Sequence, residues 1–142
     1  MTEFTHGKYI VTEPKRNIVV PKWGGSLDME KSTRVMYLDS EVIKDACYVE
    51  CVWFWPTDKE DKSSPDPHTH KYDEVIGFFG TDRADLTDLG AEIEFWIDGE
   101  RNLMNKTFLA FIPAGIVHNP LIFRKITRPV FHFAVGQGKT YA

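Results

Sequence analysis

The sequence predicts an all-β fold, and three observations support this prediction. Aromatic residues make up 13% of the 142 residues, and aromatic side chains favour strands. Short apolar or alternating segments are separated by residues typical of turns, and neither a long amphipathic helical pattern nor an internal repeat is present. Eight or more such strands predict a closed double sheet, a jelly-roll β-barrel. We expect one domain over residues 1–142, with its core barrel at residues 46–135.

The first half of the chain contains the strongest strand pattern. Residues 1–17 mix charges with few periodic apolar positions, and we expect an extended arm or edge strand there. Residues 18–20 and 34–38 predict two short strands, the first of which ends at Pro21. Residues 46–55 are nearly continuous in apolar character, which predicts burial on both faces, inside a sheet or at a subunit contact.

The second half alternates between strand patterns and turns. A charged loop over residues 58–66, a possible lid, precedes a strand at residues 74–79 and a further loop at residues 81–90. Residues 91–97 alternate strictly between apolar and polar side chains, and the following Asp98–Gly99 pair is typical of a β-hairpin turn. The remaining strands are expected at residues 107–112, 118–123 and 129–135.

Charge and apolar patterning limit the partners that we expect. Seventeen basic residues stand against 21 acidic ones without a basic stripe, so nucleic acid is not an expected partner. No apolar segment has the length of a membrane span, and the start of the chain lacks the apolar region of a signal peptide. We therefore expect a cytoplasmic protein.

The two cysteines lie on one predicted strand. Cys47 and Cys51 are four residues apart, which on a strand is about 13 Å and too far for a disulfide. We therefore expect two reduced, buried thiols.

Two histidines and a glutamate form the pattern that says most about function. Imidazole and carboxylate groups bind transition metals at neutral pH. His68 and His70 are two residues apart on an extended segment, so both point to the same side, with Cα atoms roughly 6.6 Å apart. On a straight strand Glu74 would lie about 13 Å from His70, so residues 71–73 must bend the chain to bring it to the same ion.

A third histidine comes from a distant segment. Pro113 and Gly115 predict a rigid, tight turn that presents His118. Three neutral imidazoles and one carboxylate predict a mononuclear site with open positions. Because nitrogen-rich sites disfavour Mg and Ca, we expect one divalent transition metal ion, Fe, Mn, Ni, Co, Cu or Zn.

The motif H-x-H-x-x-x-E at residues 68–74, followed by Gly80 and by P-x-G-x-x-H at residues 113–118, resembles the paired motifs of the cupin superfamily. The resemblance covers roughly residues 65–122 and implies a small double-stranded β-helix in which these histidines and the glutamate bind one metal ion. It leaves the reaction open, because cupins include dioxygenases, decarboxylases, isomerases, dehydratases, sugar-binding modules and sensors. It also implies a homodimer. The segment 81–90 is longer than in the simplest cupins and is expected to shape the barrel mouth.

Glu50 and His132 are candidates for proton transfer. Glu50 lies within an apolar run, where a carboxylate is costly unless it is paired or protonated. It is a general acid or base in the pocket, a structural partner of an arginine such as Arg34 or Arg124, or a solvated edge residue. His132 alternates with Phe131 and Phe133, and it either points into the barrel mouth or is a hydrogen-bonded core histidine.

Arg124 is a candidate for substrate binding. It shares strand parity with His118 if that strand is regular, and from the barrel interior it would hold a substrate carboxylate through two hydrogen bonds. The alternative is a surface ion pair.

These observations lead to three hypotheses. The first is a metal-dependent enzyme of the dioxygenase, decarboxylase or lyase, or isomerase type, acting on a small oxygenated or carboxylate-bearing metabolite. The second is a non-catalytic module that binds or senses a small molecule through the same metal. The third is a purely structural metal. Turnover separates the first from the second, and a closed four-coordinate shell would favour the third.

Overall fold

The structure is a computed structural model that describes residues 5–25, 27–61 and 64–142. This part of the chain contains eight β-strands and one short 3-10 helix, η1 (Gly7–Tyr9). All strand pairs are antiparallel, so the prediction of an all-β fold is confirmed. Among the described residues, no helix has the length and apolar character needed to cross a membrane.

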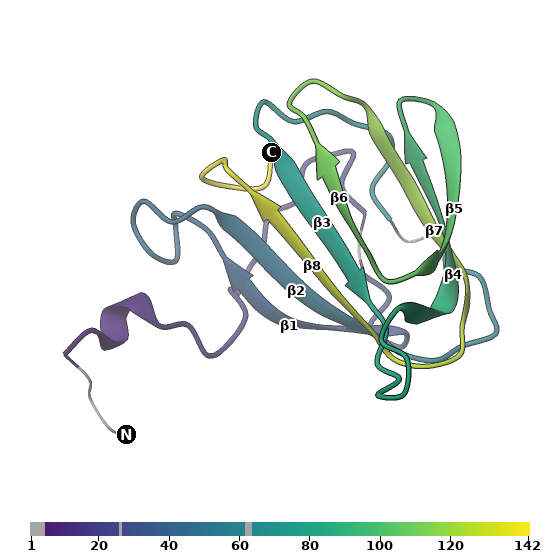
Figure 1. The fold of residues 1–142 in the computed structure, drawn as a ribbon. Coiled ribbons are helices and arrows are strands. Elements are labelled where there is room, and N and C mark those ends of the chain that lie inside the picture. The colour runs from purple at the N-terminus through teal and green to yellow at the C-terminus, as the bar shows by residue number, and fades with distance from the viewer. Residues whose placement is uncertain (1–4, 26, 62–63) are drawn as a thin grey trace.

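The strands form two sheets that face each other across a shared interior (Figure 1). The larger sheet has the order β1-β2-β8-β3-β6 and the smaller one β5-β4-β7, so the last strand lies between two early ones, as in a jelly roll. The strand bounds are Ser32–Leu38 (β1), Tyr48–Phe54 (β2), Glu74–Phe79 (β3), Asp88–Ile97 (β4), Glu100–Lys106 (β5), Phe108–Ile112 (β6), His118–Ile126 (β7) and Val130–Gly136 (β8).

The hydrophobic core lies between the two sheets and is rich in aromatic rings. Phe54 from β2 contacts Phe123 from β7 with ring centroids 4.5 Å apart, and Phe78 from β3 packs on both rings. Each aromatic side chain buries a large apolar area, which contributes much of the stability of a small barrel. The sequence is therefore aromatic-rich because the two sheet faces need bulky side chains to fill the interior.

The hairpin predicted at residues 98–99 joins β4 to β5. Ile97 pairs with Glu100 across the turn. Asp98 and Gly99 have φ values of 50° and 76°, as a two-residue hairpin turn of this type requires.

Two expectations for the first half of the chain were wrong. Residues 18–20 form no strand; instead Ile18 and Val20 lie against the interior cavity described below. Cys47 is exposed because it precedes β2, whereas Cys51 within β2 is half-buried. Both thiols are free, in agreement with the prediction that they do not pair.

The loop after β3 does not shape the mouth expected of it. Glu74 begins β3 and Phe79 ends it, so the segment that follows lies at the opposite end of the strand from Glu74 (Figure 1). Its last part, from Asp88, belongs to β4, which starts earlier than predicted.

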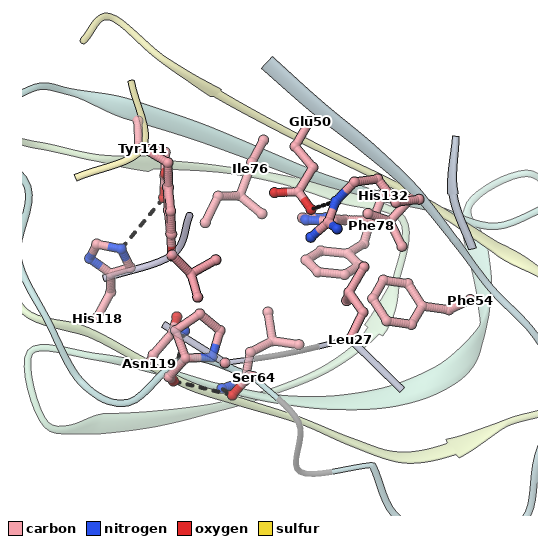
Figure 2. Close-up of a pocket in the computed structure, with 18 of the residues that line it drawn as sticks. Leu27, Glu50, Phe54, Ser64, Ile76, Phe78, His118, Asn119, His132 and Tyr141 are labelled. Carbon is pink, nitrogen blue, oxygen red and sulfur yellow. Dashed lines mark hydrogen bonds and ion pairs between the residues drawn. The ribbon is translucent and has the colours of Figure 1, made fainter. Parts of the chain in front are cut away.

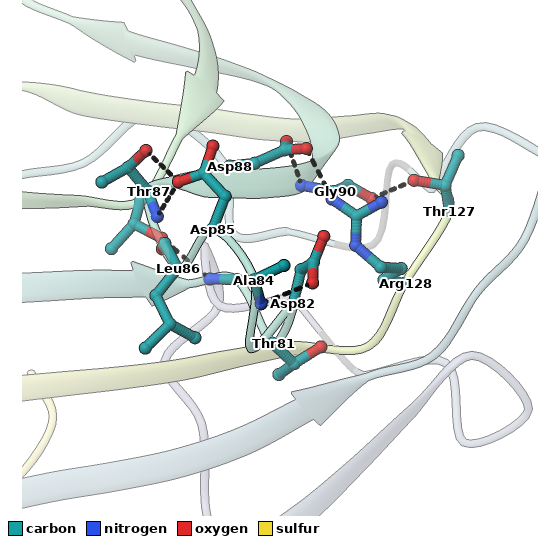
Figure 3. A network of polar contacts seen from close by, with 12 residues as sticks. Thr81, Asp82, Ala84, Asp85, Leu86, Thr87, Asp88, Gly90, Thr127 and Arg128 are labelled. Atoms are coloured by element: carbon teal, nitrogen blue, oxygen red, sulfur yellow. Dashed lines mark hydrogen bonds and ion pairs between the residues drawn. The ribbon is translucent and has the colours of Figure 1, made fainter.

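Short-range polar contacts hold that loop in place, as Figure 3 shows. Asp82 accepts a hydrogen bond from the Ala84 N–H, and Asp85 accepts one from the Thr87 N–H. Asp88 forms an ion pair of 2.7 Å with Arg128. These aspartates stabilise turns rather than surround a ligand.

Candidate metal centre

Four buried side chains from three segments meet at one end of the barrel interior. His68 and His118 lie opposite each other, because each accepts the backbone N–H of the other in an isolated antiparallel bridge. His70 follows two residues later, and Glu74 is the first residue of β3. Ligand atoms of the three histidines all lie within 4.8 Å of one another. We call His68, His70, Glu74 and His118 the histidine cluster.

The bend expected between His70 and Glu74 is present. Residues 71 and 72 form a bend immediately before β3. As a result one carboxylate oxygen of Glu74 lies 3.5 Å from His70 Nε2, and the other lies 3.4 Å from His118 Nε2. The carboxylate therefore reaches the histidines despite its distance along the chain.

Main-chain oxygens determine which ring nitrogen carries the proton in each histidine. The Nδ1 atoms of His68 and His70 lie 2.6 Å from the main-chain oxygens of Asp66 and Ala142, and His118 Nδ1 lies 3.1 Å from that of Ile116. A carbonyl oxygen only accepts, so each Nδ1 is the donor. All three Nε2 atoms then present unprotonated lone pairs to the interior.

Among the described residues, the lone pairs of this cluster lack a positive partner. The Nε2 atoms of His68 and His70 lie 3.1 Å apart with no proton between them in this tautomeric arrangement. His118 Nε2 is buried without a hydrogen-bond partner. Such an arrangement is costly by itself, whereas metal–nitrogen bonds of about 2.0–2.1 Å to one shared cation would satisfy every lone pair. The donor set therefore suits a divalent metal ion.

Burial keeps the imidazoles of His68 and His70 neutral at neutral pH. It lowers the pKa of His68 to about 4, a shift that the hydrogen bond to Asp66 only partly opposes. Burial likewise lowers the pKa of His70. Because only the neutral ring can bind a metal, protons compete weakly for these ligands near pH 7.

Three aromatic rings enclose the histidines. Trp23 stacks on His68 at 3.9 Å between ring centroids, and Tyr72 stacks on His70 at 4.8 Å. Tyr141 lies edge-on to Trp23 at 5.2 Å. Trp23 and Tyr141 were not predicted to lie here, because their contacts join segments that are distant in the sequence. Gly136 and Gly138 leave room for the Tyr72 ring, since a Cβ at either position would collide with it.

A cavity of about 130 Å³ adjoins the histidine cluster. His68, Glu74 and His118 line one end of it, next to the half-buried Tyr141. Figure 2 shows Glu50 and His132 at the far end, with apolar side chains between the two ends. The cavity thus has two polar ends and an apolar middle, which is the usual composition of a small-molecule site.

Glu50 is held by two donors at the far end of this cavity. Arg34 donates from Nε to one carboxylate oxygen at 2.9 Å, and the Tyr48 hydroxyl donates to the other at 2.6 Å. Glu50 is therefore both a lining residue and the structural partner of Arg34. We call Arg34, Tyr48, Glu50 and His132 the arginine end.

His132 lines the same cavity and is also tied to the core. Its Nδ1 lies 3.0 Å from the Gly77 carbonyl oxygen, and its ring stacks on Phe78 at 4.2 Å. Burial lowers its pKa. A neutral imidazole with a fixed Nδ1 proton leaves Nε2 as an acceptor.

Arg124 lies outside the cavity, contrary to the parity argument. Its guanidinium is 2.8 Å from Glu94, and its side chain is 45% exposed. Parity counted from His118 fails because β7 loses register with β4 between His118 and Leu121, so that Leu121 and Phe123 face the cavity and Arg124 does not. The buried positions are consequently His118, Phe123 and Ile126, and Arg124 forms a surface ion pair.

Asp61, Ser64 and Pro65 from the charged segment 58–66 line one side of the cavity. Asp61 donates its backbone N–H to Phe123 at 2.8 Å, and Ser64 Oγ accepts the Leu121 N–H at 2.9 Å. Both contacts hold the segment against β7. Residues 62 and 63 lie outside the described part of the chain, and the role of a lid stays a prediction.

No family model and no curated protein matches the chain. Solved structures do resemble it. A recombinant oxalate oxidase in complex with glycolate is 13% identical and has a TM-score of 0.52; the likeness covers 95% of this chain and 62% of that one. An RmlC-like cupin from Shewanella frigidimarina NCIMB 400 is 10% identical, with a TM-score of 0.46 over 91% of this chain and 96% of the other. KdgF from Halomonas sp. is 15% identical, with a TM-score of 0.43 over 75% and 76%.

At these identities the likeness concerns the fold alone. Two opposed antiparallel sheets in this strand order agree with the architecture that the paired motifs implied. This chain has the cupin fold.

Proposed function

We propose that this chain is a metal-dependent enzyme that acts on a small oxygenated or carboxylate-bearing metabolite. The observation that carries the proposal is the convergence of three Nε2 lone pairs and Glu74 beside a mostly apolar cavity. The reaction belongs to the dioxygenase, decarboxylase or lyase, or isomerase classes.

The histidine cluster would hold one divalent transition metal, Fe, Mn, Ni, Co, Cu or Zn. When bound, such an ion polarises substrate oxygens or lowers the pKa of bound water, and iron additionally permits dioxygen chemistry. Main-chain oxygens orient His68, His70 and His118 through their Nδ1 protons. These contacts keep the ligating nitrogens directed at one point without further rearrangement.

Glu50 and His132 are the proposed proton-transfer groups. Each carboxylate oxygen of Glu50 has a second lone pair besides the one that accepts from Arg34 or Tyr48. Glu50 can therefore accept a proton from a substrate atom in the cavity while its two donors keep it oriented. His132 would accept a proton at Nε2, because Nδ1 is committed to Gly77.

A non-catalytic binding or sensing module is the second candidate. One observation favours it: Glu50 is already ion-paired with Arg34, so its charge is compensated without any reaction. Substrate turnover would exclude this candidate.

Metal content tests the proposal directly. Wild-type protein purified without added metal, or reconstituted with it, should contain close to one transition metal ion per chain by elemental analysis. The double variant His68→Ala/His118→Ala should contain none, because two of the four ligands are gone. His132→Gln is the matched control, since it removes a barrel histidine outside the cluster and should retain the metal. Absence of metal from reconstituted wild-type protein would refute the proposal.

We also propose that the protein is a homodimer. The outer face of the five-stranded sheet is apolar, from Phe131 and Phe133 on β8 to Leu109 and Phe111 on the edge strand β6. Leu109 and Phe111 are 62% and 61% exposed, and contiguous exposed apolar side chains mark interaction surfaces. The same face on two copies can pair about a two-fold axis. Light scattering at micromolar concentration should give twice the chain mass, and Leu109→Lys/Phe111→Lys should give a single chain mass.

A further inference from the structure

We infer that Arg34 binds the end of the substrate remote from the metal, through an uncharged oxygen such as a ketone or hydroxyl. This inference rests on the proposed function and names its substrate class: a short monocarboxylate with a second, neutral oxygen at the other end. Arg34 is the only lysine or arginine among the described residues that line the cavity. It is paired with Glu50, which Figure 2 shows at the opposite end of the cavity from His118.

A β-bulge in β1 places Arg34 inside the barrel. Arg34 pairs with Val52 on β2, and Tyr37 pairs with Glu50, whereas Val35 has no partner in this register. The extra residue shifts the alternation, so Arg34 and Tyr37 face the cavity although they are three residues apart. Bulges occur frequently beside functional sites, where they redirect side chains.

The guanidinium retains unused donors. Among the described residues, its only hydrogen bond runs from Nε to Glu50, and its remaining contact is the Tyr37 ring at 5.7 Å. The two terminal amino groups therefore keep four N–H donors for an occupant of the cavity. The Arg34 side chain is only 24% exposed, so acceptors other than an occupant are scarce there.

The charges of the cavity argue against a second carboxylate at this end. Glu50 compensates Arg34, so the pair is neutral overall. With a divalent metal bound, three neutral imidazoles and the Glu74 carboxylate would leave a net positive charge of one at the histidine cluster. A single substrate carboxylate belongs there, and a second one would approach Glu50 without a free positive charge. Only a neutral acceptor suits the Arg34 donors.

The middle of the cavity defines the connecting part of the substrate. Ile76 lies between the two ends (Figure 2), and Phe78 and Leu121 also line the cavity with hydrocarbon. Polar groups on the connecting atoms would lose hydration there without compensation. A short hydrocarbon chain between the carboxylate and the neutral oxygen avoids this loss.

Matched pairs of small acids test the inference on zinc-reconstituted protein, with dissociation constants measured by calorimetry. The pairs are 3-hydroxybutanoate with butanoate, 4-oxopentanoate with pentanoate, and 5-oxohexanoate with hexanoate. At least one oxygenated acid should bind wild-type protein five-fold or more tightly than its unsubstituted partner. Arg34→Met should reduce that ratio to below two-fold without weakening the unsubstituted acid. Arg101→Met, an exposed arginine paired with Glu94, should keep the wild-type ratio.

A second variant, a dicarboxylate ligand and a zinc measurement make each outcome decisive. Arg34→Lys keeps a positive charge beside Glu50 and replaces Arg34→Met in the experiment if that variant fails to fold. It should lose at least half of the wild-type preference for the oxygenated acid over its unsubstituted partner. The inference is overturned if no pair shows a preference or if the preference survives in the folded Arg34 variants. If glutarate bound more tightly than 4-oxopentanoate, the inference that Arg34 binds an uncharged oxygen would be overturned. Zinc content is measured on the same samples: zinc without preference refutes the role of Arg34 alone, whereas absence of zinc refutes the proposed function and this inference with it.

Discussion

The two ends of the cavity each contain a mostly buried carboxylate, but the two carboxylates differ in what satisfies them. Glu50 accepts hydrogen bonds of 2.9 and 2.6 Å from Arg34 and Tyr48. The oxygens of Glu74 instead lie 3.5 and 3.4 Å from histidine nitrogens that have no proton to give in the tautomers described above. The Glu50 carboxylate is therefore satisfied within the protein, whereas the histidine cluster is completed only by a cation.

This difference assigns different roles to similar groups. A carboxylate with fixed donors is preorganised for orientation and proton transfer, and one facing bare lone pairs is a ligand. The protein thus combines a rigid polar end with one whose electrostatics depend on what it binds. Three predictions test this contrast.

The largest effect is expected on metal affinity. Glu74→Gln removes the only anion of the histidine cluster, while Glu50→Gln changes a carboxylate at the other end of the cavity. Loss of groups that merely orient metal ligands costs about 10–100-fold in affinity. We therefore expect Glu74→Gln to weaken metal binding by at least about 1,000-fold, and Glu50→Gln by less than about three-fold. Competition with a chromophoric chelator measures both. Equal losses in the two variants would contradict the distinction between the two ends.

The next effect concerns stability and compares two ion pairs. Arg34→Met leaves Glu50, whose side chain is 15% exposed, with Tyr48 as its remaining donor. Loss of a charge-assisted hydrogen bond at such a site costs about 2 kcal/mol. Arg124→Met should cost less than about 1 kcal/mol, because its side chain is 45% exposed and Arg101 still pairs with Glu94. Urea denaturation of both variants measures the difference. A larger loss for Arg124→Met would show that burial does not govern these pairs.

Regular alternation made the strands predictable, and irregular register hid part of the site. The histidine cluster was predicted from the spacing of its residues together with the resemblance to the paired cupin motifs. Regular alternation did not predict that Arg34 lies inside the barrel and Arg124 on its surface. A bulge brings the first into the cavity, and irregular pairing of β7 moves the second to the surface. No glycine or proline marks the bulge at Val35, whereas Pro120 stands at the irregularity between His118 and Leu121 and was the one available signal.

Contacts between distant segments were equally inaccessible. Tyr141 reaches the histidines only because the tail folds back over the barrel, where the main-chain oxygen of Ala142 also meets His70. A single sequence contains no periodicity that would reveal such a contact. The prediction that segment 81–90 shapes the barrel mouth failed for a related reason. The length of the segment was evident from the sequence, but the end of the barrel at which it lies depends on the direction of β3.

The smallest effect is a pH dependence located at the arginine end. Burial lowers the pKa of His132, and Glu50 only partly opposes this shift. In the unfolded chain a histidine titrates near 6.5, so below that pH the unfolded state binds a proton that the folded state does not. Stability from the neutral His132 is therefore present above about pH 6.5 and is lost as pH falls toward the lowered pKa. The loss is about 1.4 kcal/mol for each unit by which the pKa is lowered.

His132→Gln should remove this component. The free energy of unfolding of metal-free protein, measured in urea at pH 7, 6 and 5, should fall less steeply in the variant than in wild-type protein. Metal-free samples are needed because proton competition at the histidine cluster would otherwise dominate the pH dependence. Parallel curves for the two proteins would mean that His132 titrates in the folded state as it does in the unfolded chain. The arginine end would then be open to water rather than preorganised, and the contrast with the histidine cluster would rest on Glu50 alone.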